Sequence, residues 1–202
     1  MGRTPPDSGR DLLFAKAAIL ACIGLAFAQT PVRHTKVLTP EQGRYQAEVS
    51  QWVARHAELR AQAQKALSSE TARENASDCP DADTTRAQEE CLASEIRKTQ
   101  SNYAAFAEAI RTMLALAYPT MPGEPPVFGP TGKPLTSDER VKEFDRLEAE
   151  SKAYRDDASK AAYNQYRGGT LAPVFEAEAE QKLLRLHLEE MAFIYGEELS
   201  NH

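Results

Sequence analysis

Apolar residues recur at steps of three and four along most of this chain, a spacing that places them on one face of an α-helix. The longest regular run extends from about residue 84 to residue 118, which corresponds to roughly 50 Å of helix. No stretch alternates apolar and polar residues for long enough to indicate a β-strand. The sequence therefore predicts an all-α fold, with apolar stripes over residues 45–66, 92–117, 141–161 and 184–199.

Start and stop signals separate the stripes into individual helices. Thr136 and Glu139 have the spacing of a capping box, and Gly168-Gly169 would supply the left-handed turn that ends the third helix. Pro173 suits the first turn of the fourth helix.

Residues 68–83, which are rich in Ser, Glu, Asp, Asn and Thr, are expected to form a mobile connection after the first helix. Trp52 lies in the middle of the first stripe and is expected to be shielded by the other helices.

Residues 119–136 form the one clear break between stripes. They contain six prolines, which exclude helix over most of the segment. This segment would be either a linker between two domains or a long loop within one domain. Because each side offers only two stripes, we expect a single domain over residues 29–202, folded as an antiparallel bundle of about four long helices.

The first 28 residues resemble a secretory signal peptide. A basic leader containing Arg3, Arg10 and Lys16 precedes an apolar run, and the run ends at Ala28 with a small-residue cleavage pattern. That run is too short to span a bilayer, which needs about 17–25 residues, so we expect no stable membrane insertion after cleavage. Acylation of Cys22 as a lipoprotein is the alternative. Cleavage after Ala28 would leave 21 basic and 28 acidic residues, a net charge of −7.

Two cysteines, Cys79 and Cys91, would remain in the exported protein. An even number of cysteines in an oxidising compartment predicts a structural disulfide. Residues twelve apart on one continuous helix would lie about 18 Å apart, whereas a disulfide requires Cα atoms within about 7 Å. The segment after Cys79 must therefore fold back onto the second helix.

No catalytic, cofactor or metal motif is evident in the chain. The sequence lacks a nucleophile elbow, a phosphate-binding glycine loop and paired Glu-x-x-His motifs. His187 and Glu190 lie one helical turn apart, and we interpret them as an exposed pair rather than as metal ligands. Basic residues are dispersed among acidic ones in a chain of net charge −6, which argues against nucleic-acid binding. We therefore expect a protein that is not an enzyme and carries no cofactor.

A short motif set near the C-terminus resembles a known family. Tyr154-Arg155-Asp156 is followed by Gly168-Gly169-Thr170 and Pro173, with the cysteine pair upstream. Over residues 79–199 this order is similar to the lysozyme-inhibitor LprI-type family of bacterial envelope proteins. Members usually carry a tryptophan and a cysteine at the positions of Ser151 and Ser159, and the second cysteine of that bridge is missing here as well. The resemblance implies a periplasmic or secreted protein that binds lysozyme.

The motif residues have a structural and a functional interpretation. Tyr154 lies on the third apolar stripe, so its ring is expected in the core with the hydroxyl at an edge. Arg155 and Asp156 would tie neighbouring helices together through charged hydrogen bonds. Alternatively, the turn at Gly168-Gly169-Thr170 and the polar residues beside it would form an epitope for a partner. The corresponding functions are inhibition of lysozyme, or a structural or adaptor role for another envelope protein without lysozyme activity.

Mass spectrometry of the protein extracted from the cell envelope tests the export prediction. We expect an N-terminus at Gln29 and no free thiol before reduction, because Ala28 ends the signal pattern and the two remaining cysteines pair. A diacylated Cys22 at the N-terminus would contradict the cleavage site. Two thiols that react with an alkylating reagent without reduction would contradict the bridge.

Overall fold

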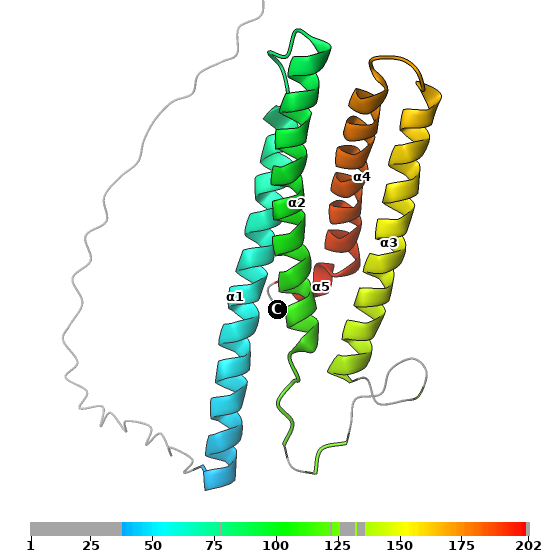
Figure 1. The fold of residues 1–202 in the computed structure, drawn as a ribbon. Helices are drawn as coiled ribbons and strands as arrows, with labels where there is room; N and C mark the ends of the chain where they lie inside the picture. Colours follow the sequence, from blue (N-terminus) through cyan, green and yellow to red (C-terminus); the bar gives the residue numbers. More distant parts are fainter. Residues whose placement is uncertain (1–37, 77, 122, 126–131, 133–135, 201–202) are drawn as a thin grey trace, which may run out of the picture. The chain divides into compact units, whose positions relative to one another are not determined.

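Long helices make up most of the described chain (Figure 1). The structure is a computed structural model that describes residues 38–76, 78–121, 123–125, 132 and 136–200. The four long helices and a short fifth are α1 (Pro40–Ala76), α2 (Thr85–Ala115), α3 (Ser137–Gln165), α4 (Ala172–Ile194) and α5 (Gly196–Leu199). Over these ranges no strand is present, so the predicted all-α helical bundle is confirmed.

The helix ends follow from local side-chain chemistry. Thr84 accepts a hydrogen bond from the backbone N–H of Ala87 at 3.1 Å and so caps α2. Thr136 and Glu139 form the predicted capping box at the start of α3. Gly168 has a φ of 89° in the turn after α3, a conformation that L side chains rarely adopt. The predicted left-handed turn is therefore present at Gly168.

α2 and α4 occupy the centre of the bundle. α1 packs mainly against α2, α3 packs mainly against α4, and α2 and α4 pack against each other. Tyr103 of α2 lies beside His187 of α4, and Thr99 lies beside Gln181, so this central pair runs in the same direction. The consecutive pairs α1–α2 and α3–α4 run in opposite directions (Figure 1). The antiparallel arrangement thus describes consecutive helices but not the central pair.

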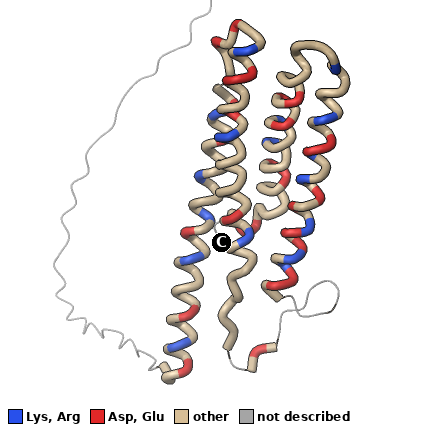
Figure 2. Tube along the Cα trace, in the orientation of Figure 1, with Lys and Arg blue, Asp and Glu red and all other residues tan. Residues whose placement is uncertain are grey.

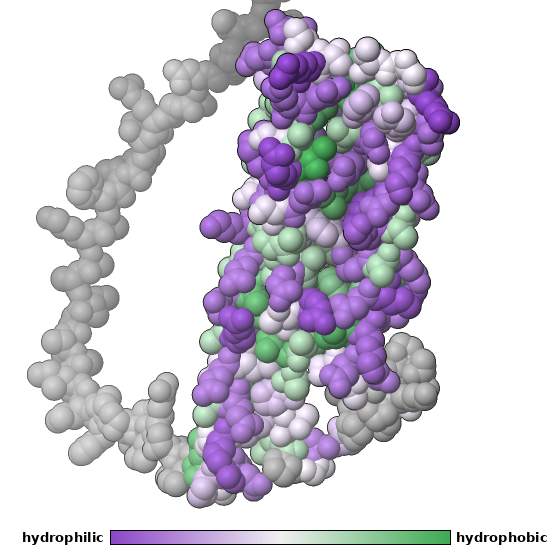
Figure 3. Space-filling view, viewed as in Figure 1, coloured by the Kyte–Doolittle hydropathy of each residue, from purple (hydrophilic) through white to green (hydrophobic). Residues whose placement is uncertain are grey.

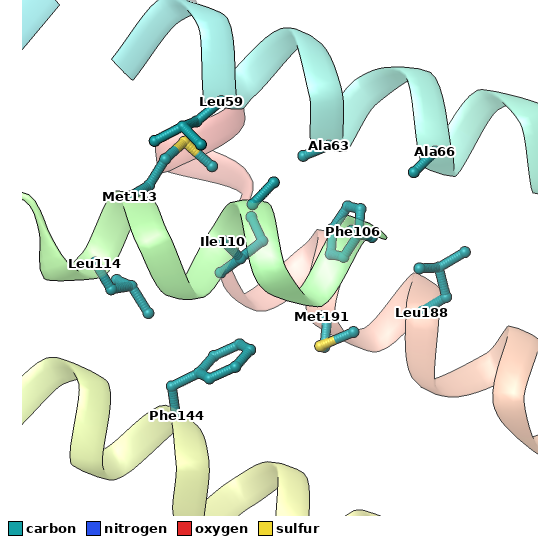
Figure 4. Packing of buried hydrophobic residues seen from close by; sticks show 11 residues of the cluster. Leu59, Ala63, Ala66, Phe106, Ile110, Met113, Leu114, Phe144, Leu188 and Met191 are labelled. Atoms are coloured by element: carbon teal, nitrogen blue, oxygen red, sulfur yellow. The ribbon is translucent and has the colours of Figure 1, made fainter. Parts of the chain in front are cut away.

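Apolar side chains from all four long helices form one core (Figure 4). Phe106 and Ile110 of α2 are fully buried, and Leu188 and Met191 of α4 pack into the same cluster. α3 contributes one buried apolar side chain, Phe144. Each such burial contributes about 1.5–3 kcal/mol to folding, so α2 and α4 supply most of this stabilisation and α3 is attached by a narrower apolar contact.

A buried carboxylate, Glu70, connects three helices. It is 1% exposed and accepts hydrogen bonds from Arg185 of α4 at 2.8 Å and from Thr99 and Asn102 of α2 at 2.7 and 2.8 Å. Burial alone would raise the pKa of Glu70, but these hydrogen bonds and the charge of Arg73 outweigh burial and lower it. Glu70 is therefore ionised and depends on its partners, because an unpaired buried charge is strongly destabilising.

The predicted disulfide between Cys79 and Cys91 is present and adjoins this network. The two Cα atoms lie 6.1 Å apart. Asp78, the residue before Cys79, accepts two hydrogen bonds from Arg185 at 2.6 and 2.8 Å. Closing a loop of this length contributes on the order of 3 kcal/mol, chiefly by restricting the unfolded chain. The bridge also holds the backbone that presents Asp78 to α4.

α1 extends farther than the sequence indicated. Residues 68–83 were expected to form a mobile connection, but α1 continues to Ala76. Its last turns are held because Arg73 donates hydrogen bonds to Glu95 at 2.6 Å and to Thr99 at 3.2 Å on α2. These tertiary contacts outweigh the weak helix propensity of the Ser- and Asn-containing segment.

The N-terminal half of α1 is covered only in part. No described residue of α1 before His56 is buried. Trp52 is half-buried: its ring stacks on His56 with centroids 4.9 Å apart and meets Tyr118 edge-on at 5.1 Å. Tyr118 belongs to the Pro-rich connection after α2, so this connection supplies part of the cover of Trp52, whose ring is half-buried and not fully shielded.

α5 joins the end of the fourth stripe to α1. The predicted fourth helix is interrupted at Tyr195, after which α5 forms a separate short turn. Glu198 of α5 contacts the His56 ring nitrogen Nε2 at 2.8 Å, and the Gln64 side chain donates to the backbone carbonyl of Leu199 at 2.9 Å. The C-terminal turn is thereby attached to the middle of α1.

Each of the four long helices carries both acidic and basic residues (Figure 2). In the described part of the chain, no helix combines the length and apolar composition needed to cross a membrane. The predicted signal peptide, residues 1–28 with Cys22, lies outside the described residues, so its cleavage stays a prediction.

Replacing Arg185 by Ala should lower the free energy of unfolding by about 3 kcal/mol, because the buried Glu70 would keep Arg73 but lose Arg185, and Asp78 would lose two hydrogen bonds. Urea unfolding monitored by circular dichroism measures the loss. Arg111→Ala is the matched control, since Arg111 pairs with Asp145 on the exposed surface and its removal should change stability little. Equal effects of the two substitutions would contradict the role of the buried network.

Candidate functional site

Tyr154 of the predicted motif lies on the surface and not in the core. Its side chain is 66% exposed, and its hydroxyl has no hydrogen bond within the described residues. The inward face of α3 runs through Phe144, Arg155 and Ser159, which are buried or half-buried. Because successive residues are turned by about 100° on a helix, Arg155 takes the inward position and Tyr154 is rotated to the edge. The core placement predicted for Tyr154 is therefore wrong.

Arg155 and Asp156 differ in what they contact. The Arg155 guanidinium lies over the ring of Tyr103 on α2, 5.1 Å from its centroid, and donates a hydrogen bond to Ser151 at 2.7 Å. Asp156 is exposed and pairs with Lys152 on its own helix at 2.6 Å. Arg155 thus contacts a neighbouring helix as predicted, although through an aromatic ring, whereas Asp156 links no helices.

Gly168, Gly169 and Thr170 form the exposed turn between α3 and α4. A Cβ on Gly169 would lie 3.2 Å from the carbonyl oxygen of Tyr166, so even a small side chain would crowd this turn. α3 continues for eleven residues beyond Tyr154, or roughly 16 Å, before this turn begins. The two halves of the motif therefore do not form one compact epitope.

A polar cluster underlies the surface around Tyr154. His187 of α4 is 7% exposed, and its Nε2 and Nδ1 atoms lie 2.9 Å from Glu148 of α3 and 2.9 Å from Glu190 of α4. Tyr103 of α2 donates its hydroxyl to Glu148. The expected exposed pair of His187 and Glu190 is thus wrong for His187, which is buried and bridges α3 and α4.

The surroundings of His187 favour its charged form. Both of its ring nitrogens face carboxylate oxygens, which only accept hydrogen bonds, so both nitrogens donate. Burial alone would lower the pKa of His187, and the charge of Arg155 acts in the same direction. The hydrogen bonds to Glu148 and Glu190 and the charge of Glu148 outweigh both, and the pKa is raised. In turn, hydrogen bonds from His187 and Tyr103 overcome burial and lower the pKa of Glu148.

Two adjoining hollows between α3 and α4 form what we call the α3–α4 groove. Their volumes are about 340 and 420 Å³, and both are lined by Ser151, Tyr154, His187 and Glu190. The first is completed by apolar and acidic side chains, and the second by Arg155 with two leucines. The remaining lining residues are Leu147, Glu148, Glu150, Met191, Ile194 and Tyr195 in the first hollow, and Leu183 and Leu186 in the second.

Exposed apolar side chains continue along α4 beside the groove. Leu186, Phe193 and Ile194 are 50%, 87% and 51% exposed. Phe193 follows Leu186 by seven residues and so lies on the same side of the helix. The face of the molecule seen in Figure 3 is mostly hydrophilic, with apolar side chains largely in the seams between helices. An exposed apolar patch of this kind is typical of an interaction surface.

Tyr103 and Glu148 complete the site but were missed by sequence reasoning. Tyr103 was assigned only to the apolar stripe of the second helix. Glu148 lies within the third stripe, four residues after Phe144, and a carboxylate on an inward face was the available signal for a buried partner. In the described residues, no group of three or more His, Cys, Asp or Glu side chains is arranged to hold a metal ion.

Comparisons of this chain with protein-family models, with curated proteins and with solved structures found no match.

The raised pKa of His187 predicts a pH-dependent contribution to stability. A raised folded-state pKa stabilises the fold fully below the unfolded value of about 6.5 and loses this effect as pH rises through the folded value. The difference in unfolding free energy between wild type and His187→Gln should therefore be larger at pH 6 than at pH 8.5. Urea unfolding at both values measures it, and a difference independent of pH would contradict a charged His187.

Proposed function

We propose that this chain is an exported binding protein of the bacterial envelope that inhibits lysozyme and has no enzymatic activity of its own. The motif order over residues 79–199 supports the choice of target through its resemblance to the LprI-type family. The disulfide between Cys79 and Cys91 supports export, because such bridges persist in oxidising compartments.

The exposure of Tyr154 is the observation that carries the proposal. A motif tyrosine that only stabilised the bundle would be expected in the core, but this ring is 66% exposed and lines both hollows of the α3–α4 groove. Tyrosine is among the side chains that dominate binding energy at protein interfaces, because it buries a large rigid surface and offers a polar tip. The groove therefore provides an anchor for a partner protein.

The polar cluster under the groove is suited to linking α2, α3 and α4 and not to catalysis. Both nitrogens of His187 are engaged by Glu148 and Glu190, so the imidazole has no free lone pair with which to act as a general base. The Tyr103 hydroxyl donates a hydrogen bond to Glu148. Burial and this hydrogen bond raise the pKa of Tyr103 above its ordinary value, so the hydroxyl keeps its proton. The cluster thus supports a binding role for this face of the bundle.

The negative net charge of the chain favours binding to a basic protein. The net charge is −6 for the whole chain and −7 after the predicted cleavage. Many lysozymes are basic, and opposite charges accelerate encounter between proteins. Inhibition would follow from occupation of the enzyme's cleft by the bound protein.

A lysozyme cell-wall clearing assay with the purified protein tests this function. Wild type should inhibit, and Tyr154→Ala should weaken inhibition about tenfold or more, a loss typical of an interface anchor. The melting temperature should change little, because the side chain is largely exposed. Tyr163→Ala is the matched control, since Tyr163 is also exposed on α3 but does not line the groove.

Two results would redirect the assignment. If Tyr154→Ala lowers the melting temperature as well as the inhibition, the side chain of Tyr154 has a structural role. Absence of inhibition by the wild type against both animal-type and bacterial lysozymes would refute the inhibitor function and leave an adaptor bundle of the envelope.

A further inference from the structure

The α3–α4 groove combines an apolar interior with carboxylates at its edge. Leu147, Met191 and Ile194 line the first hollow, together with Glu150 and Glu190. A ligand that fits both features has an apolar stem and a positively charged end. Lysine and arginine side chains have this form, because their methylene stems pack on apolar surfaces while the charged group reaches a polar edge.

The carboxylates of Glu150 and Glu190 can each accept further hydrogen bonds. Within the described residues, Glu150 accepts one hydrogen bond, from Arg146 to Oε1 at 2.7 Å, and Glu190 accepts one, from His187 to Oε2 at 2.9 Å. Both side chains are 62% exposed. Among the described residues, nothing donates to the second oxygen of either carboxylate, so each can accept a hydrogen bond from an incoming cation.

His187 positions one of these carboxylates. It is buried beneath the groove and faces Tyr103 from α2, Glu148 and Arg155 from α3, and Glu190 from its own helix. The contact with Glu190 holds that side chain beside Tyr154, which lines the same hollow. A cation above the face of a tyrosine ring, within about 6 Å of its centroid, gains a further attraction.

The charge of the chain distinguishes between possible occupants. A second copy would bring the same exposed carboxylates, Glu150 and Glu190, and another net charge of −6 to the interface, and like charges in such an interface are unfavourable. A basic protein presents the opposite charge. The exposed Leu186 and Phe193 beside the groove would contact apolar residues that flank the basic one.

We propose that the α3–α4 groove binds one lysine or arginine side chain of a basic partner protein, which stacks on Tyr154 and pairs with Glu150 and Glu190. This inference rests on the proposed function as a binding protein and adds the chemistry that the groove recognises. It does not depend on the partner being lysozyme.

Nuclear magnetic resonance of the isotope-labelled protein tests the groove without lysozyme. The probes are two capped tripeptides, acetyl-Leu-Arg-Leu-amide and acetyl-Leu-Gln-Leu-amide, which differ only in the charged side chain. The arginine peptide should shift the amide signals of Tyr154, Glu190 and Ile194 in a saturable way, with an affinity at least fivefold higher than that of the glutamine peptide. Equal shifts with both peptides, or no shift at the groove, would overturn the inference.

Substitution of Glu190 supplies the second arm of the experiment. Glu190→Gln removes the charge but keeps an oxygen that can accept from His187, and it should reduce the affinity for the arginine peptide at least threefold. Glu189→Gln is the matched control, because Glu189 is exposed on the same helix but does not line either hollow. Unchanged affinity in Glu190→Gln, with the fold intact by circular dichroism, would also overturn the inference.

Failure of the inference and failure of the proposed function are distinguishable. Wild type that inhibits lysozyme but does not prefer the arginine peptide keeps the function and loses the groove chemistry. Wild type that prefers the arginine peptide but inhibits no lysozyme keeps the groove chemistry and loses the target.

Discussion

The ion pair between Glu70 and Arg185 is the interaction on which the arrangement of the helices depends. It joins α1 to α4 across α2, and both side chains are buried. Apolar packing alone would tolerate small rotations of α4, because leucine and methionine side chains repack at modest cost. A buried ion pair tolerates them less, since such a rotation would move Arg185 away from Glu70 and Asp78 and leave Glu70 with Arg73 as its one cationic partner among the described residues. The pair therefore favours one rotation of α4, and Asp78 beside the disulfide strengthens it from the other side.

The rotation of α4 decides which of its residues reach solvent. With Arg185 directed at Glu70 and Leu188 in the core, Leu186 and Phe193 are turned outward because each residue advances by about 100° around the helix. His187 then faces α3 and bridges to Glu148. The same rotation of α4 thus exposes Leu186 and Phe193 and places His187 against Glu148. For this reason the α3–α4 groove has apolar residues in its lining and a charged cluster beneath it.

α3 is attached by a different balance of forces. It contributes Phe144 to the core with Val141 beside it, but several of its other inward positions are polar, including Glu148, Ser151 and Arg155. A helix held this way leaves room beside α4, and the two hollows around Tyr154 occupy that room. The same feature that weakens the apolar contact of α3 therefore creates the surface proposed to bind a basic partner.

Local patterns were enough to predict the elements of this fold, and tertiary contacts decided how they are used. Helical spacing, the Thr136–Glu139 cap, the Gly168 turn and the cysteine pair all depend on neighbouring residues or on a short loop, so they were readable along the chain. The exposure of Tyr154 and the burial of His187 were not readable in this way, because a one-residue rotation of a helix exchanges an inward side chain for an outward one. That rotation is set by partners far away in sequence, such as Glu70 for Arg185 and Glu148 for His187. The sequence by itself determined that the chain forms helices and where most of them begin. Tertiary contacts decided where α1 ends, and the packing of charged side chains between helices decided which face each helix presents.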